Sequence, residues 1–395
     1  MRDKRSAMIR VIAAWGFLAA CAILPAQLIS PERMDPSDRA LLDAPESRRE
    51  FFCKLRTLPP SLGFDLRYRA GWEVRLRTSD MSPAGDRLRA VVRVKPEKDG
   101  ATALHLQESY RLPLRATIPG KNLVTSGGYS LGAGRYHVDW VLRDSRNRAC
   151  SEHWVVEVKH RDDLRLAMAD GIVAPIYTGR GFRRPVPDSR PAAARIFSVK
   201  ILANFSNTSA RRATLNGQDM EAVASILRTI AREPGFARFS LVAFNMQEQR
   251  VIYQAQDASQ LDFPALGRAL GEVRPGVIDY SLLIDKNSAT RFVTKLLSTH
   301  LAENEHAPDA VLLVGPKLFL DSKVPKEAID VISESRVPVF YLNYVGSPNA
   351  MPWRDSLGDA VKAYGGKEFR ITFPKDLGAA LAEILRRLEA AKPPS

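Results

Sequence analysis

Three side chains that carry oxygen atoms follow one strand-like segment at alternate positions. The mostly apolar run 199–203 leads into Asn204, Ser206 and Thr208, which supply one amide and two hydroxyl groups. This spacing is typical of a metal-binding loop, but hard cations such as Mg²⁺ prefer oxygen ligands that include carboxylates. None of the three residues is an acid. The pattern therefore predicts a loop with the form of a cation site and without its negative charge.

A second candidate for chemistry is the GxSxG pattern of Gly128, Ser130 and Gly132. Serine hydrolases place such a serine on a sharp turn between a strand and a helix. Here a glycine-rich stretch and a strand-like run follow the serine, so we expect a turn serine without a catalytic role. His137 and Asp139 lie two positions apart on one predicted strand, and nothing in the sequence places either beside Ser130.

Other catalytic and nucleic-acid-binding patterns are missing from the sequence. The six His residues form no HExxH or HxH pair, which argues against a catalytic zinc. Lys121 follows Gly120 without the remainder of a phosphate-binding loop. The sequence contains no zinc-finger, RNA-recognition or basic-zipper pattern, so we expect no specific nucleic-acid partner. These observations favour a protein that is not an enzyme.

Length and charge indicate more than one domain. The chain has 395 residues, 45% of them hydrophobic, which is ordinary for packed globular protein. Of the net charge of +14, residues 51–160 contribute 19 basic and 11 acidic side chains, whereas the chain from residue 196 onward is nearly neutral. A basic surface would therefore belong to the first domain, where it favours solubility or weak attraction to anionic polymers and lipids.

Residues 1–26 have the order of a secretory signal peptide. Basic residues precede the apolar run 11–24, and small residues end at Ala26. Cleavage there would give an exported chain that is periplasmic, secreted or held in the cell envelope. Two alternatives stay open: an uncleaved anchor, and lipidation of Cys21 in the lipobox-like sequence LAAC. In either alternative the leader would be the only contact with a membrane.

Removal of the leader leaves two cysteines, Cys53 and Cys150. In an oxidising compartment they are natural partners, because their spacing fits neither a CxxC redox motif nor a zinc site. Such a bond would stabilise the first domain by about 4 to 5 kcal/mol in the chain-entropy model. Two buried free thiols are the alternative.

Strand-like segments with turns between them fill residues 51–160. They are FDLRYRA, WEVRLRT, LRAVVRVKP, ALHLQESYRL, GRYHVDWVLRD and SEHWVVEVK. Several alternate polar and apolar residues, which predicts an antiparallel β-sandwich of immunoglobulin-like type. Residues 27–50 are polar and contain Pro, so we expect a tether with a single helical turn. Residues 161–195 are rich in Pro, Gly and Arg, which predicts a linker.

From residue 196 onward, strand and helix patterns alternate. Strands are predicted at 196–205, 239–245, 250–256, 310–315, 337–345 and 367–372, and helices at 219–233, 263–273, 289–304, 325–336 and 376–389. Such alternation predicts a mostly parallel, doubly wound α/β sheet of Rossmann-like type, with helices on both faces. The chain is therefore expected to be multidomain, with a sandwich before an α/β domain.

In their order, these elements resemble a von Willebrand factor type A domain across residues 196–391. The resemblance rests on the strand and loop at Asn204, on FSLVAFNMQEQRVIYQAQDASQLDFPALGRAL, on AVLLVGPKLFLDSK followed by VPVFYLNYV, and on GGKEFRITFPKDLGAALAEILRRL. An exported chain with a small sandwich before such a domain also resembles a bacterial group called VWFA-related. The resemblance implies a binding module.

The family binds Mg²⁺ or Mn²⁺ through a DxSxS loop, a threonine from a second loop and a further Asp. At the matching positions the resemblance places Asn204 for the first Asp, Ser206 and Thr208 for the hydroxyls, Ser281 for the threonine and Gly315 for the second Asp. Both carboxylates are missing. With neutral ligands only, the attraction that offsets dehydration of a cation largely disappears.

The expected cofactor is therefore none, although weak Mg²⁺ binding stays open if Asp279, Asp285 or Asp321 substitutes from a shifted loop. We expect an exported protein that binds a protein partner or a cell-envelope component through the loops around the five mapped residues. A cation-dependent adhesion module is one alternative. An envelope protein that binds or hydrolyses anionic polymers is another.

Overall fold

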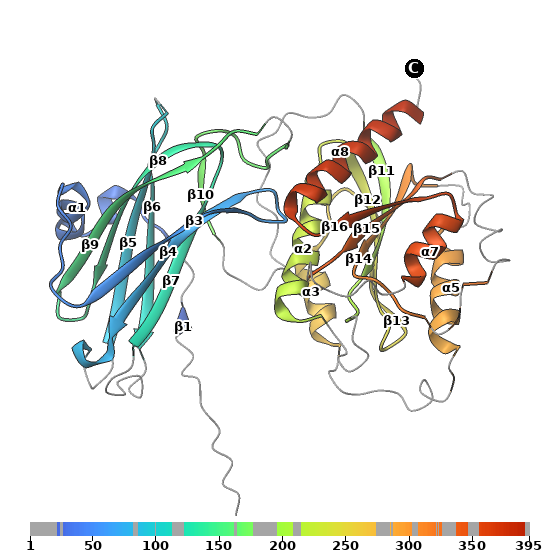
Figure 1. Ribbon diagram of the computed structural model, residues 1–395, viewed down its shortest axis with the longest axis horizontal. Helices are drawn as coiled ribbons and strands as arrows, with labels where there is room; N and C mark the ends of the chain where they lie inside the picture. Colours follow the sequence, from blue (N-terminus) through green and yellow to red (C-terminus); the bar gives the residue numbers. More distant parts are fainter. Residues whose placement is uncertain are drawn as a thin grey trace, which may run out of the picture.

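Figure 1 shows the computed structural model, in which three β-sheets and flanking helices form two parts of the chain. The first part contains two antiparallel sheets, and the second contains one mixed sheet with helices. The structure describes residues 22–23, 27–81, 86–98, 100–112, 122–161, 164–176, 196–207, 215–273, 285, 287–301, 307–320, 322, 324–325, 337–346 and 355–391.

The first part places two antiparallel sheets face to face. One has the strand order β1-β6-β5-β8-β9, with β2 also paired to β6, and the other has the order β10-β7-β4-β3. Its strands are β1 (Ala22–Ile23), β2 (Gln27–Leu28), β3 (Cys53–Leu62), β4 (Tyr68–Arg77), β5 (Asp86–Pro96), β6 (Leu104–Leu112), β7 (Asn122–Leu131), β8 (Gly134–Arg143), β9 (Ala149–Val158) and β10 (Val173–Pro175). Residues of both sheets share one core, including the buried Trp72, Tyr129 and Trp140. An antiparallel sandwich is therefore confirmed, while its immunoglobulin-like type stays a prediction.

A disulfide joins the two sheets of this sandwich. Cys53 begins β3 in one sheet and Cys150 lies in β9 of the other, with a Cα–Cα distance of 6.6 Å. The predicted pairing is confirmed, and the alternative of two free thiols is wrong. The bond is consistent with an exported protein. Within the described ranges, no helix has both the length and the apolar character needed to span a bilayer.

The sandwich differs from the sequence prediction in three of its strands. The pattern does not predict β3 or β7, and the two strands expected at 64–70 and 72–78 form the single strand β4. Glycines are the reason in β4 and β7, because Gly71 interrupts one pattern and Gly127 with Gly128 interrupts the other. Gly71 and Gly128 pair in register. A Cβ atom on Gly127 would lie 2.2 Å from the Trp72 ring, so this glycine allows a close approach within a continuous strand.

The segment 27–50 packs on the sandwich, which corrects the prediction of a tether. Besides β2 it contains the 3₁₀ turn η1 (Pro31–Arg33) and the helix α1 (Pro36–Asp43). Leu41 and Leu42 of α1 are buried in a cluster with Val91 of β5 and Val141 of β8. The polar composition of this segment predicts a tether, but ion pairs hold α1 against the sheet without a wide apolar face.

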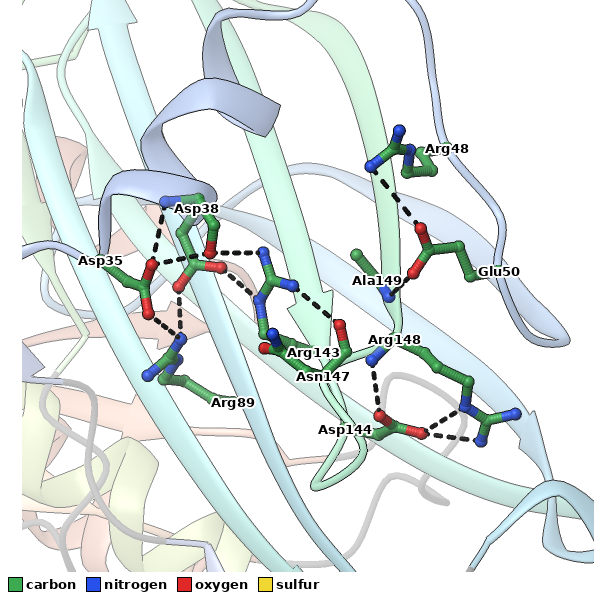
Figure 2. A network of polar contacts seen from close by, with 11 residues as sticks. Asp35, Asp38, Arg48, Glu50, Arg89, Arg143, Asp144, Asn147, Arg148 and Ala149 are labelled. Atoms are coloured by element: carbon green, nitrogen blue, oxygen red, sulfur yellow. Dashed lines mark hydrogen bonds and ion pairs between the residues drawn. The ribbon is translucent and has the colours of Figure 1, made fainter.

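Figure 2 shows these ion pairs between α1 and the sheet below it. Asp38 is 1% exposed, and its two oxygen atoms accept hydrogen bonds from Arg143 and Arg89, each at 2.7 Å. Arg143 also donates to the carbonyl of Asn147 at 2.9 Å. Because a buried carboxylate needs such partners, the Asp38 network fixes the position of α1 on β5 and β8.

The predicted linker 161–195 also begins with packed structure. Leu164 is buried beside Leu66, and β10 pairs with the end of β7. Residues 177–195 lie outside the described residues, as do residues 1–21 and 24–26 of the predicted leader. Cleavage near Ala26 therefore stays a prediction.

The second part is built on a mixed sheet with the strand order β13-β12-β11-β14-β15-β16. All neighbouring strands are parallel except β13, which is antiparallel to β12. The strands are β11 (Phe197–Asn204), β12 (Phe236–Asn245), β13 (Arg250–Ala258), β14 (Ala310–Gly315), β15 (Val339–Tyr344) and β16 (Lys367–Ile371). Each predicted strand of this region is confirmed to within a few residues.

Helices cover both faces of this sheet (Figure 1). They are α2 (Gly217–Ala231), α3 (Phe263–Gly271), α5 (Ser288–Leu301), α7 (Ser356–Ala363) and α8 (Pro374–Ala391). Side chains of α2, α3 and α8 share one core with the sheet, and those of α5 and α7 share another. The sequence pattern does not predict α7, and residues 326–336 of the predicted helix 325–336 lie outside the described residues.

The turn between β3 and β4 contacts the second part of the molecule, as Figure 1 shows for the hairpin that reaches α2. The ring of Phe64 packs edge-on against that of Tyr344, with centroids 5.6 Å apart. The Thr229 hydroxyl donates to the Phe64 carbonyl at 2.7 Å, and Arg232 donates to the Asp65 carbonyl at 2.9 Å. The two parts are therefore joined by a defined packing contact as well as by the chain.

Candidate functional site

The candidate site lies at the C-terminal ends of β11 and β14. The chain continues from β11 to β12 on one side, and β14 pairs with β11 on the other, so this is the topological switch point of the sheet. Open α/β sheets bind ligands in the crevice between the loops at this edge. Asn204 is the last residue of β11, and Gly315 is the last residue of the neighbouring strand β14. The structure therefore brings together two of the five predicted site residues.

The side chain of Asn204 is buried at this edge of the sheet and bonds to the protein itself. It is 1% exposed. Its Nδ2 donates to the Pro316 carbonyl at 2.9 Å, and its Oδ1 accepts from the backbone N–H of Ser206 at 3.0 Å. The first bond needs an amide, because a carboxylate has no hydrogen to donate. Asn204 thus ties the end of β11 to the loop after β14.

Gly315 makes a close backbone contact with the same strand end. Its φ angle is +133°, a region that side chains with a Cβ atom rarely adopt. A Cβ atom at this position would lie 2.5 Å from the carbonyl oxygen of Asn204. An Asp at residue 315 would therefore collide with the strand end, so the second carboxylate of the resembling family has no room here.

Ser206 is also held inside the protein. It is buried, and its Oγ accepts from the backbone N–H of Met246 at 2.7 Å. Asn204 and Ser206 therefore use these polar atoms to join neighbouring strand ends, which corrects the expectation that they offer them to a partner. Thr208 and Ser281 lie outside the described residues.

The donor set does not fit a divalent cation. Its described members are an amide and a hydroxyl that already hold backbone N–H groups, and neither carries charge. Of the proposed substitute acids, Asp285 pairs with Arg291 and accepts from the Asn287 N–H at 3.0 Å. Asp279 and Asp321 lie outside the described residues. The part of the chain that is described contains no group of three or more His, Cys, Asp or Glu residues suited to a metal.

The loop after β14 presents an aromatic side chain at this same edge. Phe319 is 61% exposed, whereas its neighbours Leu318 and Leu320 are buried. The loop is fixed by three hydrogen bonds to α7 and its cap: Leu318 N–H to Asp355 at 3.2 Å, Leu320 N–H to the Ser356 hydroxyl at 3.1 Å, and Ser356 N–H to the Leu318 carbonyl at 2.8 Å. Phe319 is therefore exposed to solvent on a loop that hydrogen bonds to α7 and its cap hold in place.

A polar cluster of Asn343, Asp355 and Glu368 lies beside that loop. Asn343, the neighbour of Gly315 on β15, donates to Glu368 at 2.7 Å and to Asp355 at 3.3 Å. Burial raises the pKa of the Asp355 carboxyl. This cluster could not be predicted from the sequence, because its members come from separate elements. The run Leu318, Phe319, Leu320 also does not indicate which of its side chains is exposed.

A second exposed aromatic residue follows β16. Phe373 is 51% exposed. Its backbone N–H donates a hydrogen bond to the Asp376 carboxylate, at the start of α8, at 2.7 Å. Phe319 and Phe373 thus both follow the C-terminal ends of parallel strands, with β15 between those strands. Single exposed apolar residues are common, but two phenylalanines at one sheet edge are suited to binding an apolar surface.

The GxSxG pattern forms no hydrolase site. Ser130 is buried within β7, where it pairs with Arg69 and Ala174, so the expected turn serine is a strand serine. The strand continues to Leu131 because β4 and β10 pair with it on both sides. His137 contacts Glu97 at 2.8 Å instead of Ser130. Asp139 lies on the same strand and pairs with His153 at 2.8 Å.

Comparisons with known proteins add no relative from which to transfer a function. No protein-family model matches the chain, and no curated protein matches it. Solved structures that match include a β-glucosidase from Listeria innocua in complex with glucose, at 12% identity and a TM-score of 0.18, covering 29% of this chain and 17% of that one. A Bacteroides uniformis β-glucuronidase matches at 12% identity and a TM-score of 0.18, covering 79% and 38%.

A glycosyl hydrolase family 2 member from Bacteroides cellulosilyticus DSM 14838 matches at 7% identity and a TM-score of 0.19, covering 80% of this chain and 38% of that one. The chain spans 17% to 38% of the lengths of these three proteins. Similarities with TM-scores this low carry no argument about fold or function.

Proposed function

We propose that this chain is an exported, non-enzymatic binding protein whose second part is a type A-like domain that works without a cation. The strand order β13-β12-β11-β14-β15-β16, with only β13 antiparallel, supports the type A-like, doubly wound assignment. The predicted leader and the disulfide between Cys53 and Cys150 support export. Fold alone does not fix the function, so the binding role rests on the sheet edge.

The observation that carries the proposal is a sheet edge at which the residues in the cation-ligand positions bond to the protein itself and two phenylalanines are exposed. Asn204 bonds to the Pro316 carbonyl where the resembling family keeps a cation ligand, and Gly315 excludes a second acid. Phe319 and Phe373 stand exposed at the same edge. Recognition there would use apolar contact and shape instead of a shared metal ion. The partner is a protein or another cell-envelope component with an apolar recess.

A capture experiment on the native cell envelope tests this proposal. The bait is the full chain in its parent form, as Phe319→Ala combined with Phe373→Ala, and as Ile196→Ala. Ile196 is the matched control, because it is 60% exposed and precedes β11, at the opposite edge of the sheet. Each bait is used with Mg²⁺ and with a chelator.

We expect the parent and the Ile196 variant to capture the same component, the double phenylalanine variant to lose it, and the chelator to change nothing. Equal capture by all baits would show that the edge is not the binding surface. Capture that the chelator abolishes would support the cation-dependent adhesion module instead.

A further inference from the structure

A carboxyl group lies inside the sandwich, where apolar side chains are the rule. Glu108 of β6 is only 5% exposed. The Tyr110 hydroxyl, on the same strand, donates a hydrogen bond to its Oε2. Burial raises the pKa of Glu108. Interior carboxylates are normally paired with a cation or a metal, so this one needs an explanation.

No cation of the described residues pairs with Glu108. Arg69 of β4 lines the same cavity, but its guanidinium pairs with Asp65 at 2.9 Å. Tyr110 supplies a neutral donor only. Within the described chain, Arg69 and Tyr110 are the titratable groups that line the cavity with Glu108 or touch it. Among the described residues, the carboxylate therefore has no cation paired with it.

Glu108 faces a cavity of about 420 Å³ that β3, β4 and β7 help to form. Leu58 and Ile176 supply apolar walls, and Ser61 and Ser126 supply hydroxyl groups. Three glycines also line the cavity, together with Pro59, Ala70 and Arg69. A Cβ atom on Gly127 would come 2.5 Å from Glu108 Oε2, so only a glycine there leaves the carboxylate in place.

Gly71 and Gly128 pair with each other across β4 and β7 and also line the cavity. A Cβ atom on Gly71 would lie 2.2 Å from the Gly127 carbonyl oxygen, and one on Gly128 would lie 2.8 Å from the Ala70 carbonyl oxygen, so these glycines let β4 and β7 lie close together beside the cavity. The sequence showed these glycines only as interruptions of a strand pattern. They line the cavity together with Glu108, whose carboxylate pairs with no cation among the described residues.

We propose that this cavity binds a primary ammonium group on a short aliphatic chain, such as the side chain of a lysine in a peptide. The ammonium group pairs with the Glu108 carboxylate, and the methylene groups pack against Leu58 and Ile176. Tyr110 already donates to the carboxylate, so the ligand has to bring donors and positive charge. This site lies in the sandwich and is independent of the edge with Phe319.

The test compares two ligands on the unmodified full-length chain by isothermal titration calorimetry. One is Nα-acetyl-lysine methylamide, and the other is Nα-acetyl-norleucine methylamide, which has a similar aliphatic chain without the ammonium group. We expect saturable binding of the lysine compound and at least about tenfold weaker binding of the norleucine compound, as for a charge-assisted contact. Equal affinities, or no saturable binding of the lysine compound at any soluble concentration, would overturn the proposal.

Variants then assign the contact to Glu108. Glu108→Gln keeps the shape and an acceptor for Tyr110 but removes the charge, and should weaken the lysine compound at least about tenfold. Glu157→Gln, an exposed acid on β9, is the control and should leave the affinity unchanged. Unchanged affinity in Glu108→Gln would overturn the assignment. A thermal unfolding profile recorded beside the titration separates loss of the carboxylate from loss of the fold.

Proton release gives a second readout that a purely structural role of Glu108 would not produce. An ammonium group beside the carboxylate lowers the pKa that burial has raised, so binding near that pKa should release protons. Titrations of the lysine compound in two buffers with different ionisation enthalpies should then give different apparent heats. Identical heats in a pH series through the acidic range would contradict the pairing with Glu108.

Discussion

Replacing Asn204 with Asp restores the acid that the resembling family carries, and in this protein the change should be harmful. The substitution keeps the size of the side chain and the acceptor that holds the Ser206 N–H. It removes the donor that bonds to the Pro316 carbonyl at 2.9 Å. A negatively charged oxygen would then face a carbonyl oxygen at a position that is 1% exposed.

The expected loss of stability follows from two contributions. A lost hydrogen bond of this kind costs about 1 kcal/mol, and a buried polar group left without its partner costs about 1 to 3 kcal/mol more. We therefore expect Asn204→Asp to lower the free energy of unfolding of the second part by about 2 to 4 kcal/mol. Protonation of the new carboxyl in acid restores a donor, so the loss should shrink as the pH falls.

Scanning calorimetry is the assay, because it resolves separate transitions in a chain with two parts. Asn287→Asp is the matched control. Asn287 is exposed and its side-chain oxygen only accepts, from the Ser322 hydroxyl at 3.2 Å, so the same chemical change should have little effect there. Unchanged stability of Asn204→Asp, or a loss that millimolar Mg²⁺ reverses, would refute the inference that residue 204 needs an amide to donate to the Pro316 carbonyl.

Three further predictions concern the sandwich. Replacing Cys53 and Cys150 by Ser should lower its free energy of unfolding by about 4 to 5 kcal/mol, because the bond spans a sequence separation of 97 residues; denaturant unfolding measures this, and an unchanged midpoint would contradict it. Asp38→Asn should cost about 3 to 5 kcal/mol, because it leaves the buried Arg143 without its anion, and amide exchange should show α1 opening first. Burial raises the pKa of Glu108 above its unfolded value, so its ionised form costs stability above the raised pKa and the cost is relieved as the pH falls through it. Glu108→Gln should therefore unfold at a higher temperature than the parent at neutral pH, with a difference that narrows in acid; a difference independent of pH would contradict this.

The strands of the second part could be predicted from the sequence because they are buried on both faces. β14 reads AVLLVG and is buried throughout, which gives a continuous apolar run that needs no knowledge of its neighbours. The sandwich strands β3 and β7 could not be predicted in the same way. Pro59 and Pro60 lie within β3, where the pairing with β4 shifts register between Leu58 and Ser61. Gly127 and Gly128 lie within β7, where a side chain would collide with neighbouring atoms.

For the candidate site, the sequence singled out Asn204 and Gly315, which lie at neighbouring strand ends, but it did not predict their contacts. Spacing after an apolar strand was enough to single out Asn204 and Ser206. The partner of Asn204 is the carbonyl of Pro316, which lies 112 residues further along the chain and meets it only because β11 and β14 pair. Glu108 and Phe319 gave no signal for a similar reason, since a cavity and an exposed side chain are properties of the folded surface.

We propose that the edge of the sheet at Asn204 needs no cation, because the Asn204 side chain already bonds to the Pro316 carbonyl and the Ser206 N–H. A thermal shift titration with Mg²⁺ and Mn²⁺ tests it most directly, with the parent chain and Asn204→Ala measured side by side. We expect no saturable stabilisation of the parent by either ion. A saturable rise in the unfolding temperature of the parent that Asn204→Ala abolishes would contradict it.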